Sequence, residues 1–482
     1  MASHAYTKKD IERLLGAAVG KTLGEVDSKG VFLRAEKNPK ITGIAGDVIE
    51  QSVLGYPANS DGDPDLDVDG TLVELKTTGL RKKNGEIEAK EPMSITAVRI
   101  GSIQNEDDFE KSHFWLKCSN LLIVFYLYAS KDTVNALGYR GFPIVDYCFN
   151  EFTDEDKDTL RNDWTIVRDF LRELDTLPCP ENEYPRLSSE LRDRLALIDT
   201  APKYPHPPRF RLKRTFVTSI YMNSLKRKKR KDGSLDEQID SYAELDAKCR
   251  SVRLRFGGMS LSQIAEELGI DIRIAKNNAE QIVSRMIGGK AKKMSGIELF
   301  RKFGISCKTV VLTEKGGRTE DMKLFPLDLD EMQDDSVAFE DSSFFEYFWN
   351  HQLLAAVFQE PYDKCPYGEI VFHGFKRMTM PESFIEGEAK QLFKGIRSLI
   401  LEDRLRDEVV CNKDGTPRIN PNGTVSTAPN FPKSKDGNLF IRGGGIDSLD
   451  KPVVVNGIHM YRQSVWCKGT FIVRQLEGKD YC

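Results

Sequence analysis

The stretch "DGDPDLDVDGTLVELKTT", residues 61–78, carries six carboxylates in its first fourteen residues, and its last acid, Glu74, is followed two residues later by Lys76. The second half alternates with a period of two and contains β-branched residues, which predicts a β-strand. Asp69-Gly70 is a strong two-residue turn signal, because both residues tolerate positive φ. The sequence therefore predicts an acidic β-hairpin.

A turn at these two residues determines which residues face each other across the hairpin. Asp65 would face Glu74, and Lys76 would lie on the same face as Glu74, about 6.6 Å further along at roughly 3.3 Å per residue. Two carboxylates on one face can hold a hard divalent ion such as Mg²⁺, while a lysine beside them orients or deprotonates a water. A solvated acidic hairpin without a catalytic role is the alternative interpretation.

The same run also matches the first half of a calcium loop of the EF-hand type. Three aspartates, beginning with Asp65, stand at positions 1, 3 and 5, and a glycine stands at position 6. Position 12 must be a bidentate Glu, but it is Lys76, whose charge would repel the ion. The predicted strand also replaces the second helix of an EF-hand, so a calcium loop is disfavoured.

Length and composition indicate an ordinary globular protein of two or three domains. The chain has 482 residues, of which 40% are hydrophobic and 30% charged. Its longest apolar run, residues 121–129, is too short to cross a bilayer, and the first ten residues contain no apolar signal core. Nine cysteines without a CxxC pair suit reduced thiols, and six scattered histidines offer no zinc spacing. We therefore expect a cytoplasmic protein that does not enter the membrane.

Positive charge is concentrated locally, although the net charge is −4. The basic segments are "PRFRLKR" (208–214), "KRKKRK" (226–231) and "KAKK" (290–293). In the first of them, alternation puts basic side chains on one face of a strand and apolar side chains on the other. Such a strand suits phosphate contact, with an exposed strand edge as the alternative. The candidate DNA-binding residues of this segment are Arg209, Arg211, Lys213 and Arg214.

Residues 259–289 read as two or three short helices, within which "SQIAEELGI" is typical of a helix-turn-helix. This pattern favours an alternative function, that of a non-catalytic DNA-binding regulator. Helical connectors between domains show the same pattern.

The last part of the chain, residues 293–482, faintly repeats the first. "KTTGLRKKNG" from Lys76 aligns with "KTVVLTEKGG" from Lys308, and "LKRTFV" from Leu212 aligns with "CKGTFI" from Cys467. We therefore expect a second copy of the first domain.

The second copy lacks the acids of the hairpin. Ser306 stands where Glu74 is, and no aspartate matches Asp65 or Asp67. Because a divalent-ion site of this kind needs at least two anionic ligands, we expect the second copy to be catalytically inactive.

Five motifs in order resemble the MutH family of PD-(D/E)xK nucleases. They are "GDVIEQSVLG", the "PD…VELKTT" hairpin, the strand preceded by Lys117, "LRNDW" and "RFRLKRTFVTSI". The family includes the mismatch-repair nicking endonuclease and MutH-like type II restriction enzymes that cut at GATC. Residues 293–482 resemble the second, degenerate MutH-like domain of the two-domain restriction enzymes.

The resemblance implies a mixed α/β protein with two tandem restriction-endonuclease-like domains. The catalytic domain would span residues 1–225, a basic helical connector 226–292, and a degenerate DNA-binding or allosteric effector domain 293–482. The implied activity is Mg²⁺-dependent, sequence-specific cleavage of double-stranded DNA, at GATC. The alternative within the family is a repair nickase, although that enzyme has a single domain.

The resemblance also implies roles for individual residues. Asp65, Glu74 and Glu50 would be the metal ligands, Lys76 the catalytic lysine and Lys117 a second lysine at the scissile phosphate. The family usually leaves six residues between its aspartate and glutamate, which selects Asp67, whereas the "PD" dipeptide and the Asp-Gly turn select Asp65. We favour Asp65, with Asp67 as the alternate.

Base recognition in the family comes from the loop before the basic strand. This loop is "DTAPKYPHPP" (199–208), which makes Lys203 the candidate for a base contact. In the second copy Lys468 is a further candidate for DNA binding. One active site per chain implies a homodimer on DNA or engagement of two DNA sites. A restriction enzyme also implies a cognate DNA methyltransferase in the same prokaryotic host.

Overall fold

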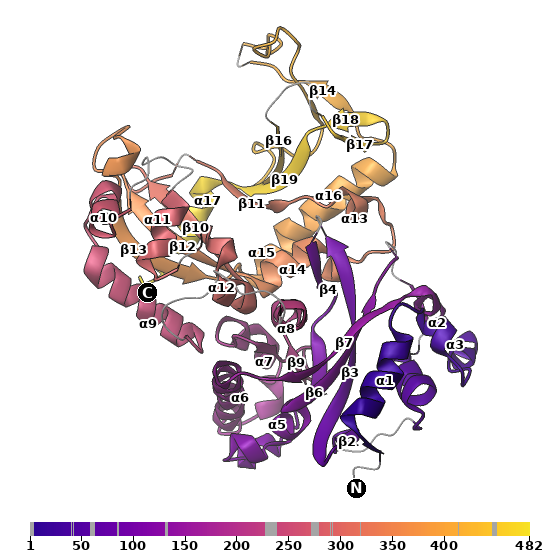
Figure 1. Ribbon diagram of the computed structural model, residues 1–482. Coiled ribbons are helices and arrows are strands. Elements are labelled where there is room, and N and C mark those ends of the chain that lie inside the picture. Colours follow the sequence, from indigo (N-terminus) through magenta and orange to yellow (C-terminus); the bar gives the residue numbers. More distant parts are fainter. Residues whose placement is uncertain are drawn as a thin grey trace. The chain divides into compact units, whose positions relative to one another are not determined.

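The computed structural model describes residues 4–39, 41, 43–57, 63–83, 86–130, 134–226, 239–270, 279–289, 291, 293–318, 320–412, 414–445 and 451–482. The chain forms two compact units, Met1–Ala247 with Gly288–Gly304, and Lys248–Ile287 with Ile305–Cys482. Each unit combines helices with β-sheets (Figure 1). The predicted mixed α/β class is confirmed, and the units are described separately below.

The first unit is built on a mixed sheet with the strand order β1-β2-β3-β6-β7, to which β4 adds beside β3. β3 and β6 run parallel, whereas β6 and β7 are antiparallel. A smaller sheet has the order β5-β9-β8. The strands are β1 (Ala5–Tyr6), β2 (Leu66–Val68), β3 (Thr71–Lys83), β4 (Glu86–Ala89), β5 (Met93–Ala97), β6 (Asn120–Leu127), β7 (Ile144–Glu151), β8 (Ile198–Asp199) and β9 (Arg209–Leu212).

The β2–β3 hairpin has the predicted register. Leu66 pairs with Val73 and Val68 with Thr71. The turn residues Asp69 and Gly70 have φ of 49° and 85°, which is the two-residue turn that matches the twist of the strands. Because β3 continues through the position of Lys76, the segment is not the calcium loop of an EF-hand.

Helices cover both faces of the main sheet (Figure 1). The first group packs on the face that carries Val73, Leu75 and Leu122. It consists of α1 (Lys8–Ala18), α2 (Leu23–Val26), α3 (Phe32–Lys37), α4 (Ile44–Val48) and the π-helix η1 (Ile49–Leu54). The other elements are η2 (Ile103–Asn105), η3 (Phe109–Lys111), α5 (His113–Cys118), η4 (Ala136–Gly141), α6 (Asp154–Leu174), η5 (Pro180–Asn182), α7 (Arg186–Ser189), η6 (Leu191–Asp193), α8 (Arg214–Lys226), η7 (Met294–Gly296) and α12 (Glu298–Phe303).

Helix α6 shows why the sequence pattern is a sound guide to the core. Its apolar residues recur at helical spacing and are all buried: Leu160, Trp164, Val167, Leu171 and Leu174. Buried Asp163 accepts hydrogen bonds from the backbone N–H groups of Ala196, Leu197 and Ile198 at 2.9, 2.7 and 3.0 Å. This carboxyl therefore ties the helix to β8.

The second unit repeats the central strand pairings of the first. Its two main sheets have the orders β10-β12-β13 and β11-β19-β16. As in β3-β6-β7, the first pair is parallel and the second antiparallel. The strands are β10 (Ile305–Leu312), β11 (Met322–Pro326), β12 (Gln352–Gln359), β13 (Val371–Met378), β14 (Asp407–Val409), β15 (Thr427–Pro429), β16 (Leu439–Gly444), β17 (Val453–Val455), β18 (Ile458–Met460) and β19 (Arg462–Cys467).

The strand registers of the two units match at the positions where the internal repeat is predicted. Met93 pairs with Leu212 and Met322 pairs with Cys467, and in both sheets the register shifts two residues after the methionine. Leu212 and Cys467 are the two positions that the sequence alignment equated. The same β-bulge therefore survives in both copies.

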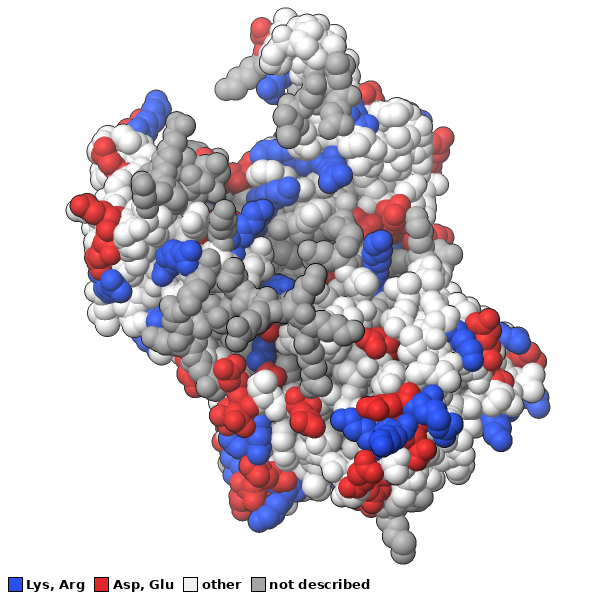
Figure 2. Space-filling view, viewed as in Figure 1, with Lys and Arg blue, Asp and Glu red and all other residues white. Residues whose placement is uncertain are grey.

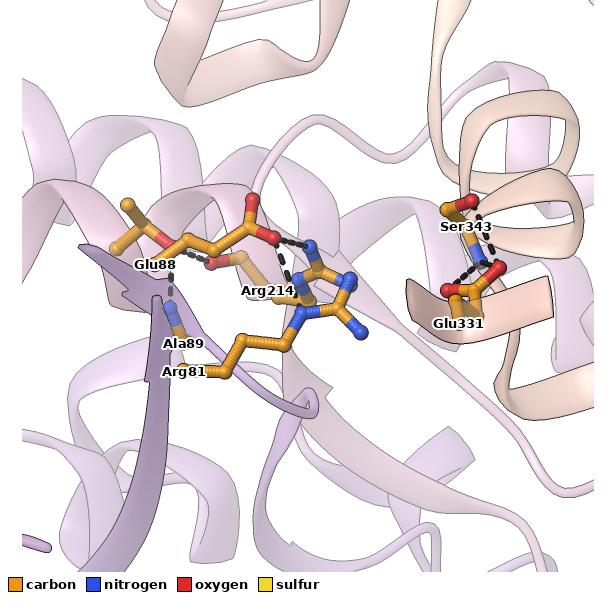
Figure 3. Close-up of polar contacts among 7 residues, drawn as sticks. Arg81, Glu88, Ala89, Arg214, Glu331 and Ser343 are labelled. Carbon is orange, nitrogen blue, oxygen red and sulfur yellow. Dashed lines mark hydrogen bonds and ion pairs between the residues drawn. The ribbon is translucent and has the colours of Figure 1, made fainter. Parts of the chain in front are cut away.

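Helix caps repeat as well. Ser112 caps α5 and Ser342 caps α14, and each hydroxyl also donates to a phenylalanine carbonyl three residues earlier. In the second unit Glu331 accepts a hydrogen bond from the N–H of Ser343 at 2.9 Å, at the start of α14 (Figure 3). A carboxylate at a helix N-terminus complements the partial positive charge there.

The helices of the second unit include the segment that resembles a helix-turn-helix. Leu261, at the start of α10, donates its N–H to the Ile370 carbonyl at 3.0 Å, next to β13. Residues 271–278 lie outside the described residues, so the helix-turn-helix stays a prediction. The helices are α9 (Tyr242–Phe256, begun in the first unit), α10 (Leu261–Glu267), α11 (Ala279–Met286), α13 (Leu329–Gln333), η8 (Phe339–Asp341), α14 (Ser343–Asn350), η9 (Tyr367–Glu369), α15 (Glu382–Phe384), η10 (Ile385–Ala389), α16 (Lys390–Leu401) and α17 (Gly469–Leu476).

The domain boundaries expected at residues 225 and 292 stay a prediction. Residues 248–287 group with the second unit and residues 288–304 with the first. Among the described residues, the helices lack the combination of length and apolar character that crossing a bilayer requires.

Candidate active site

The hairpin brings Asp65 next to Glu74. The N–H of Leu75 donates to Asp65 Oδ2 at 2.9 Å, so the Asp65 carboxyl lies against β3 beside Glu74. Asp67 is held differently, because its Oδ1 accepts the N–H of Gly70 at 2.8 Å and closes the turn. Of the two alternates, Asp65 is therefore the one placed beside Glu74.

Glu74 is a buried carboxylate between two lysines. Only 4% of the residue is exposed. Lys76 Nζ lies 2.7 Å from Glu74 Oε1, and Lys117 Nζ lies 2.8 Å from Oε2. Both contacts are charge-assisted hydrogen bonds, which hold the carboxylate in one orientation.

Lys117 reaches this point from α5, at the start of β6. The residue is 7% exposed, and its ammonium also donates to the carbonyl of Asp63. Since β6 runs parallel to β3, the end of α5 lies beside the middle of the hairpin strand. The structure therefore brings Lys117 to the hairpin residues Glu74 and Lys76, although Lys117 is distant from them in the sequence.

Glu50 approaches β3 from the π-helix η1. A Cβ placed on Gly46 would lie 4.0 Å from Glu50 Oε1 and 3.6 Å from Thr77 Oγ1, so the Glu50 carboxyl lies against the strand. Burial, followed by the charges of Asp65 and Asp47, raises the pKa of Glu50 to about 7. A π-helical turn widens the helix locally and is frequent at functional sites.

Asp65 is affected in the same direction. Burial, together with the charge of Glu74, raises the pKa of Asp65 above its ordinary value. Two neighbouring acids, Glu50 and Asp65, therefore have raised pKa values. Clustered acids with raised pKa values are typical of sites that bind a cation or transfer a proton.

The acidic cluster fits a hard divalent ion in its chemistry. Carboxylate oxygens are the ligands that Mg²⁺ prefers, and a cation between Asp65, Glu74 and Glu50 would relieve their mutual repulsion. Within the described ranges, no three acidic, histidine or cysteine side chains are arranged closely enough to enclose an ion by themselves. Mg²⁺ usually keeps several waters and takes only one or two carboxylates, so this arrangement remains compatible with it.

Sequence reasoning did not identify His113. It lies on the same helix as Lys117, four residues earlier, and its Nε2 is 2.9 Å from the Thr96 hydroxyl. Burial, with the nearby charges of Arg99 and Lys117, lowers the pKa of His113. The i, i+4 spacing from Lys117 was the available signal.

The candidate DNA-binding residues of β9 separate into two groups. Arg209 and Lys203 are exposed. Arg211 is half-buried and forms a two-pronged ion pair with Asp199, at 2.7 and 3.1 Å. The predicted alternation of basic and apolar residues holds along the strand, because Phe210 is buried.

Lys213 and Arg214 have internal partners. Lys213 is 4% exposed and donates to the Leu195 carbonyl. Arg214 is 5% exposed, and its Nη2 lies 2.7 Å from Glu88 Oε1. Figure 3 shows Arg81 and Arg214 converging on Glu88, which links β3 and β4 to α8. A DNA contact by either residue stays a prediction, and the structure places both inside the first unit.

The equivalent site of the second unit has a serine in place of the buried glutamate. Ser306 pairs with Leu353 as Glu74 pairs with Leu121, so the strand pairing agrees with the predicted equivalence of Ser306 and Glu74. Lys308, the counterpart of Lys76, is retained, and burial lowers its pKa.

Charge on the visible surface is mixed. Figure 2 shows Lys and Arg interspersed with Asp and Glu over both units. Of the basic segments predicted from sequence, residues 227–231, 290 and 292 lie outside the described residues. Lys468 is half-buried and directly precedes α17.

A family model described as MutH, DNA mismatch repair enzyme MutH, matches residues 54–163. These residues are MutH-like. The matched segment contains the hairpin, Lys117 and Asp163, whereas Glu50 lies just before it. The MutH-like segment supports a nuclease that acts on DNA, with a restriction-endonuclease-like fold. No curated protein matches the chain.

Proposed function

We propose that the protein is a Mg²⁺-dependent type II restriction endonuclease that hydrolyses double-stranded DNA at GATC. The observation that carries the proposal is the convergence of Asp65, Glu50 and Lys76 on the buried carboxylate of Glu74, within or next to the MutH-like segment. The GATC site and the restriction role rest on the sequence resemblance.

Asp65, Glu74 and Glu50 would hold the ion together with water molecules that complete its coordination. When bound, Mg²⁺ neutralises the charge of the phosphodiester and lowers the pKa of a bound water. Lys76, once its ammonium leaves Glu74, can orient the attacking water and stabilise the charge that develops on the phosphate. Lys117 is held by the Asp63 carbonyl, and its role is to keep Glu74 oriented and to face the scissile phosphate.

Exposed cations of the first unit would position the duplex. Lys203 is the candidate for a base contact and Arg209 for a phosphate contact. Each phosphate that a cation neutralises adds about 0.9 to the slope of log affinity against log salt concentration. Binding should therefore weaken steeply as salt rises.

The second unit would bind DNA or act as an effector. Lys323 pairs with Trp466 of β19, and Arg442 pairs with Ser464. Arg462 lies on β19 itself, two residues before Ser464. Because alternate residues of a strand share a face, these three exposed cations lie on one face of the β11-β19-β16 sheet. The Arg442 guanidinium stacks 4.7 Å from the Trp466 ring and also pairs with Asp321. Figure 2 shows basic side chains gathered over these strands. A cationic face with an aromatic component suits contact with nucleic acid.

One active site per chain leaves two ways to cut both strands. Two chains can meet on a palindromic site, or one chain can make two successive nicks. We propose that the second unit engages a second copy of the site. Full double-strand cleavage by chains lacking Ser306 to Cys482 would contradict this part of the proposal.

The repair-nickase alternative is favoured by the description of the matching family and disfavoured by the second unit. Incubation of the protein with unmethylated plasmid and Mg²⁺, followed by sequencing of the new ends, distinguishes the two. Fragments that all end at GATC would support restriction, whereas nicked circles would support the nickase. Intact plasmid with retained binding would favour the regulator. Repetition on adenine-methylated plasmid tests whether methylation protects the site, as protection by a cognate methyltransferase requires.

A further inference from the structure

The backbone of Tyr56 is hydrogen-bonded to the carbonyl of Glu50, at the end of the helix that carries Glu50. Gly55 has φ of 88° and ends the π-helix η1. The N–H groups of Gly55 and Tyr56 both donate to the Glu50 carbonyl, at 2.8 and 3.0 Å. The left-handed conformation of Gly55 thus reverses the chain and places the backbone of Tyr56 beside the end of η1.

The ring of Tyr56 is fixed in the core. The residue is 4% exposed, and its ring stacks on His4 with centroids 4.3 Å apart and an interplanar angle of 19°. It belongs to the same apolar cluster as Val73 and Leu75 of β3. Tyr56 therefore has little freedom to turn its hydroxyl towards solvent.

The hydroxyl of Tyr56 has no hydrogen-bond partner among the described residues. A buried polar group left in that state costs about 1–3 kcal/mol, which is enough that such groups in native proteins call for an explanation. The neighbouring Tyr6 shows the ordinary arrangement, because its hydroxyl donates to the Leu54 carbonyl at 2.8 Å. The two phenols lie in the same cluster, yet only that of Tyr6 has a hydrogen-bond partner in the part of the chain that the structure describes.

The charges of the active-site acids act on the Tyr56 hydroxyl. Glu50 acts on it most strongly, followed by Asp65, and the effect of Glu74 is weaker. Burial and these anions raise the pKa of Tyr56, so the phenol is a neutral O–H donor. A buried O–H donor whose backbone is hydrogen-bonded to Glu50 is available to a carboxylate whose other oxygen is engaged by a cation.

We propose that Tyr56 is a positioning residue of the active site, whose hydroxyl donates a hydrogen bond to the ionised Glu50 carboxylate when a divalent ion is bound. Carboxylates that ligate metals are themselves hydrogen-bonded as a rule, and these outer partners orient the ligand. The inference rests on the proposed function, since it assigns Glu50 to the ion site. It adds a residue of this chain that the resemblance does not include.

The test compares Tyr56→Phe with Tyr6→Phe in the full-length protein. Each variant loses one phenol oxygen from the same cluster. In EDTA, Tyr56→Phe should melt at or above the wild-type temperature, because it removes an unsatisfied group, whereas Tyr6→Phe should melt lower. Titration with Mn²⁺, followed by the shift in melting temperature, should show affinity weakened about 10-fold or more by Tyr56→Phe and unchanged by Tyr6→Phe.

A double-mutant cycle identifies the acid through which Tyr56 acts. In a Glu50→Gln background, Tyr56→Phe should weaken Mn²⁺ binding by less than 2-fold, because the two residues act as one unit. Wild-type Mn²⁺ affinity in Tyr56→Phe, or melting in EDTA as low as that of Tyr6→Phe, would overturn the proposal. No Mn²⁺-dependent shift in the wild-type protein would instead refute the ion site of the proposed function.

Discussion

The hydroxyls of Ser306 and Tyr347 lie 3.3 Å apart, and this contact holds in the second unit the place that the Glu74–Lys117 ion pair holds in the first. Ser306 is the strand counterpart of Glu74. Tyr347 is the fifth residue of α14, as Lys117 is the fifth residue of α5. The charged pair of the first unit is thus matched by a neutral, part-buried hydrogen bond in the second. Such a pair keeps the packing of the fold and offers no anion for a cation.

The two copies provide a matched test of the catalytic lysine. Lys76→Ala should reduce plasmid cleavage by at least about 100-fold, because it removes the cation beside the reacting phosphate. DNA affinity, measured by gel shift, should stay within a few-fold of wild type. Lys308→Ala removes the counterpart in the second unit and should leave the cleavage rate within a few-fold of wild type. Equal losses in the two variants would place the active site elsewhere.

Substitution of Asp65 and of Asp67 should have different effects on ion binding and cleavage. Asp65→Asn removes a charge beside Glu74 and should abolish the stabilisation by Mn²⁺ in a thermal titration, together with cleavage. Asp67→Asn affects the bond to the Gly70 N–H and should cost no more than about 1 kcal/mol of stability while retaining activity. The reverse pattern would select Asp67 as the ligand.

The raised pKa of Glu50 makes a prediction about pH. The folded-state pKa is about 7, against 4.5 for the ordinary side chain, so the folded protein binds this proton more tightly than the unfolded chain. The associated stability is fully present below about pH 4.5 and is lost as pH rises through 7. In EDTA, Glu50→Gln should therefore melt above wild type at pH 8, with the difference vanishing near pH 5.

Exposed Glu12 on α1 supplies the control for that experiment. Glu12→Gln should change the melting temperature by an amount that does not depend on pH in this range. A stabilising effect of Glu50→Gln that grows as pH falls would contradict the assigned shift. In the cleavage assay, higher Mg²⁺ should move the activity midpoint to lower pH, because the cation competes with the proton for the carboxylate.

Substitution of Lys213 should reduce stability, whereas substitution of Lys203 should reduce DNA binding. Lys213 is buried, donates to the Leu195 carbonyl and lies near the buried Asp163. Lys213→Met should cost about 1–3 kcal/mol, because it leaves the buried Leu195 carbonyl without its donor. Urea unfolding measures this loss.

Lys203→Ala should instead leave stability unchanged and weaken binding. If the residue contacts phosphate, the slope of log affinity against log salt should fall by about 0.9. If it reads a base, affinity for GATC should fall with no change in affinity for unrelated DNA. An unchanged affinity for both would remove Lys203 from the interface.

Local chemistry explains what could be predicted from the sequence. The Asp69-Gly70 turn, the register that follows from it and the buried stripe of α6 depend on φ preferences and on period, which neighbouring residues determine among themselves. The internal repeat could be predicted because the aligned motifs contain equivalent strand positions. Leu212 pairs with Met93 in the first unit, and Cys467 pairs with Met322 in the second.

Alternation was a weaker guide beyond the end of a strand. Arg209 is exposed as the pattern predicts, yet Lys213 is buried, since β9 ends at Leu212 and the chain enters α8. Once a strand or helix has ended, the direction of the next side chain depends on how the following element packs. The periodicity of the strand carries no information about that packing.

The sequence by itself determined the hairpin, the order of its acids and the lysine that follows them, because turn and strand preferences act between residues close in the chain. Only the tertiary structure decided that Asp65, not Asp67, lies beside Glu74, that Lys117 meets the same carboxylate, and that the pKa of Glu50 is raised to about 7. Those properties arise from burial and from charges brought together across the sheet. They exist only once parallel strands and the π-helix have packed.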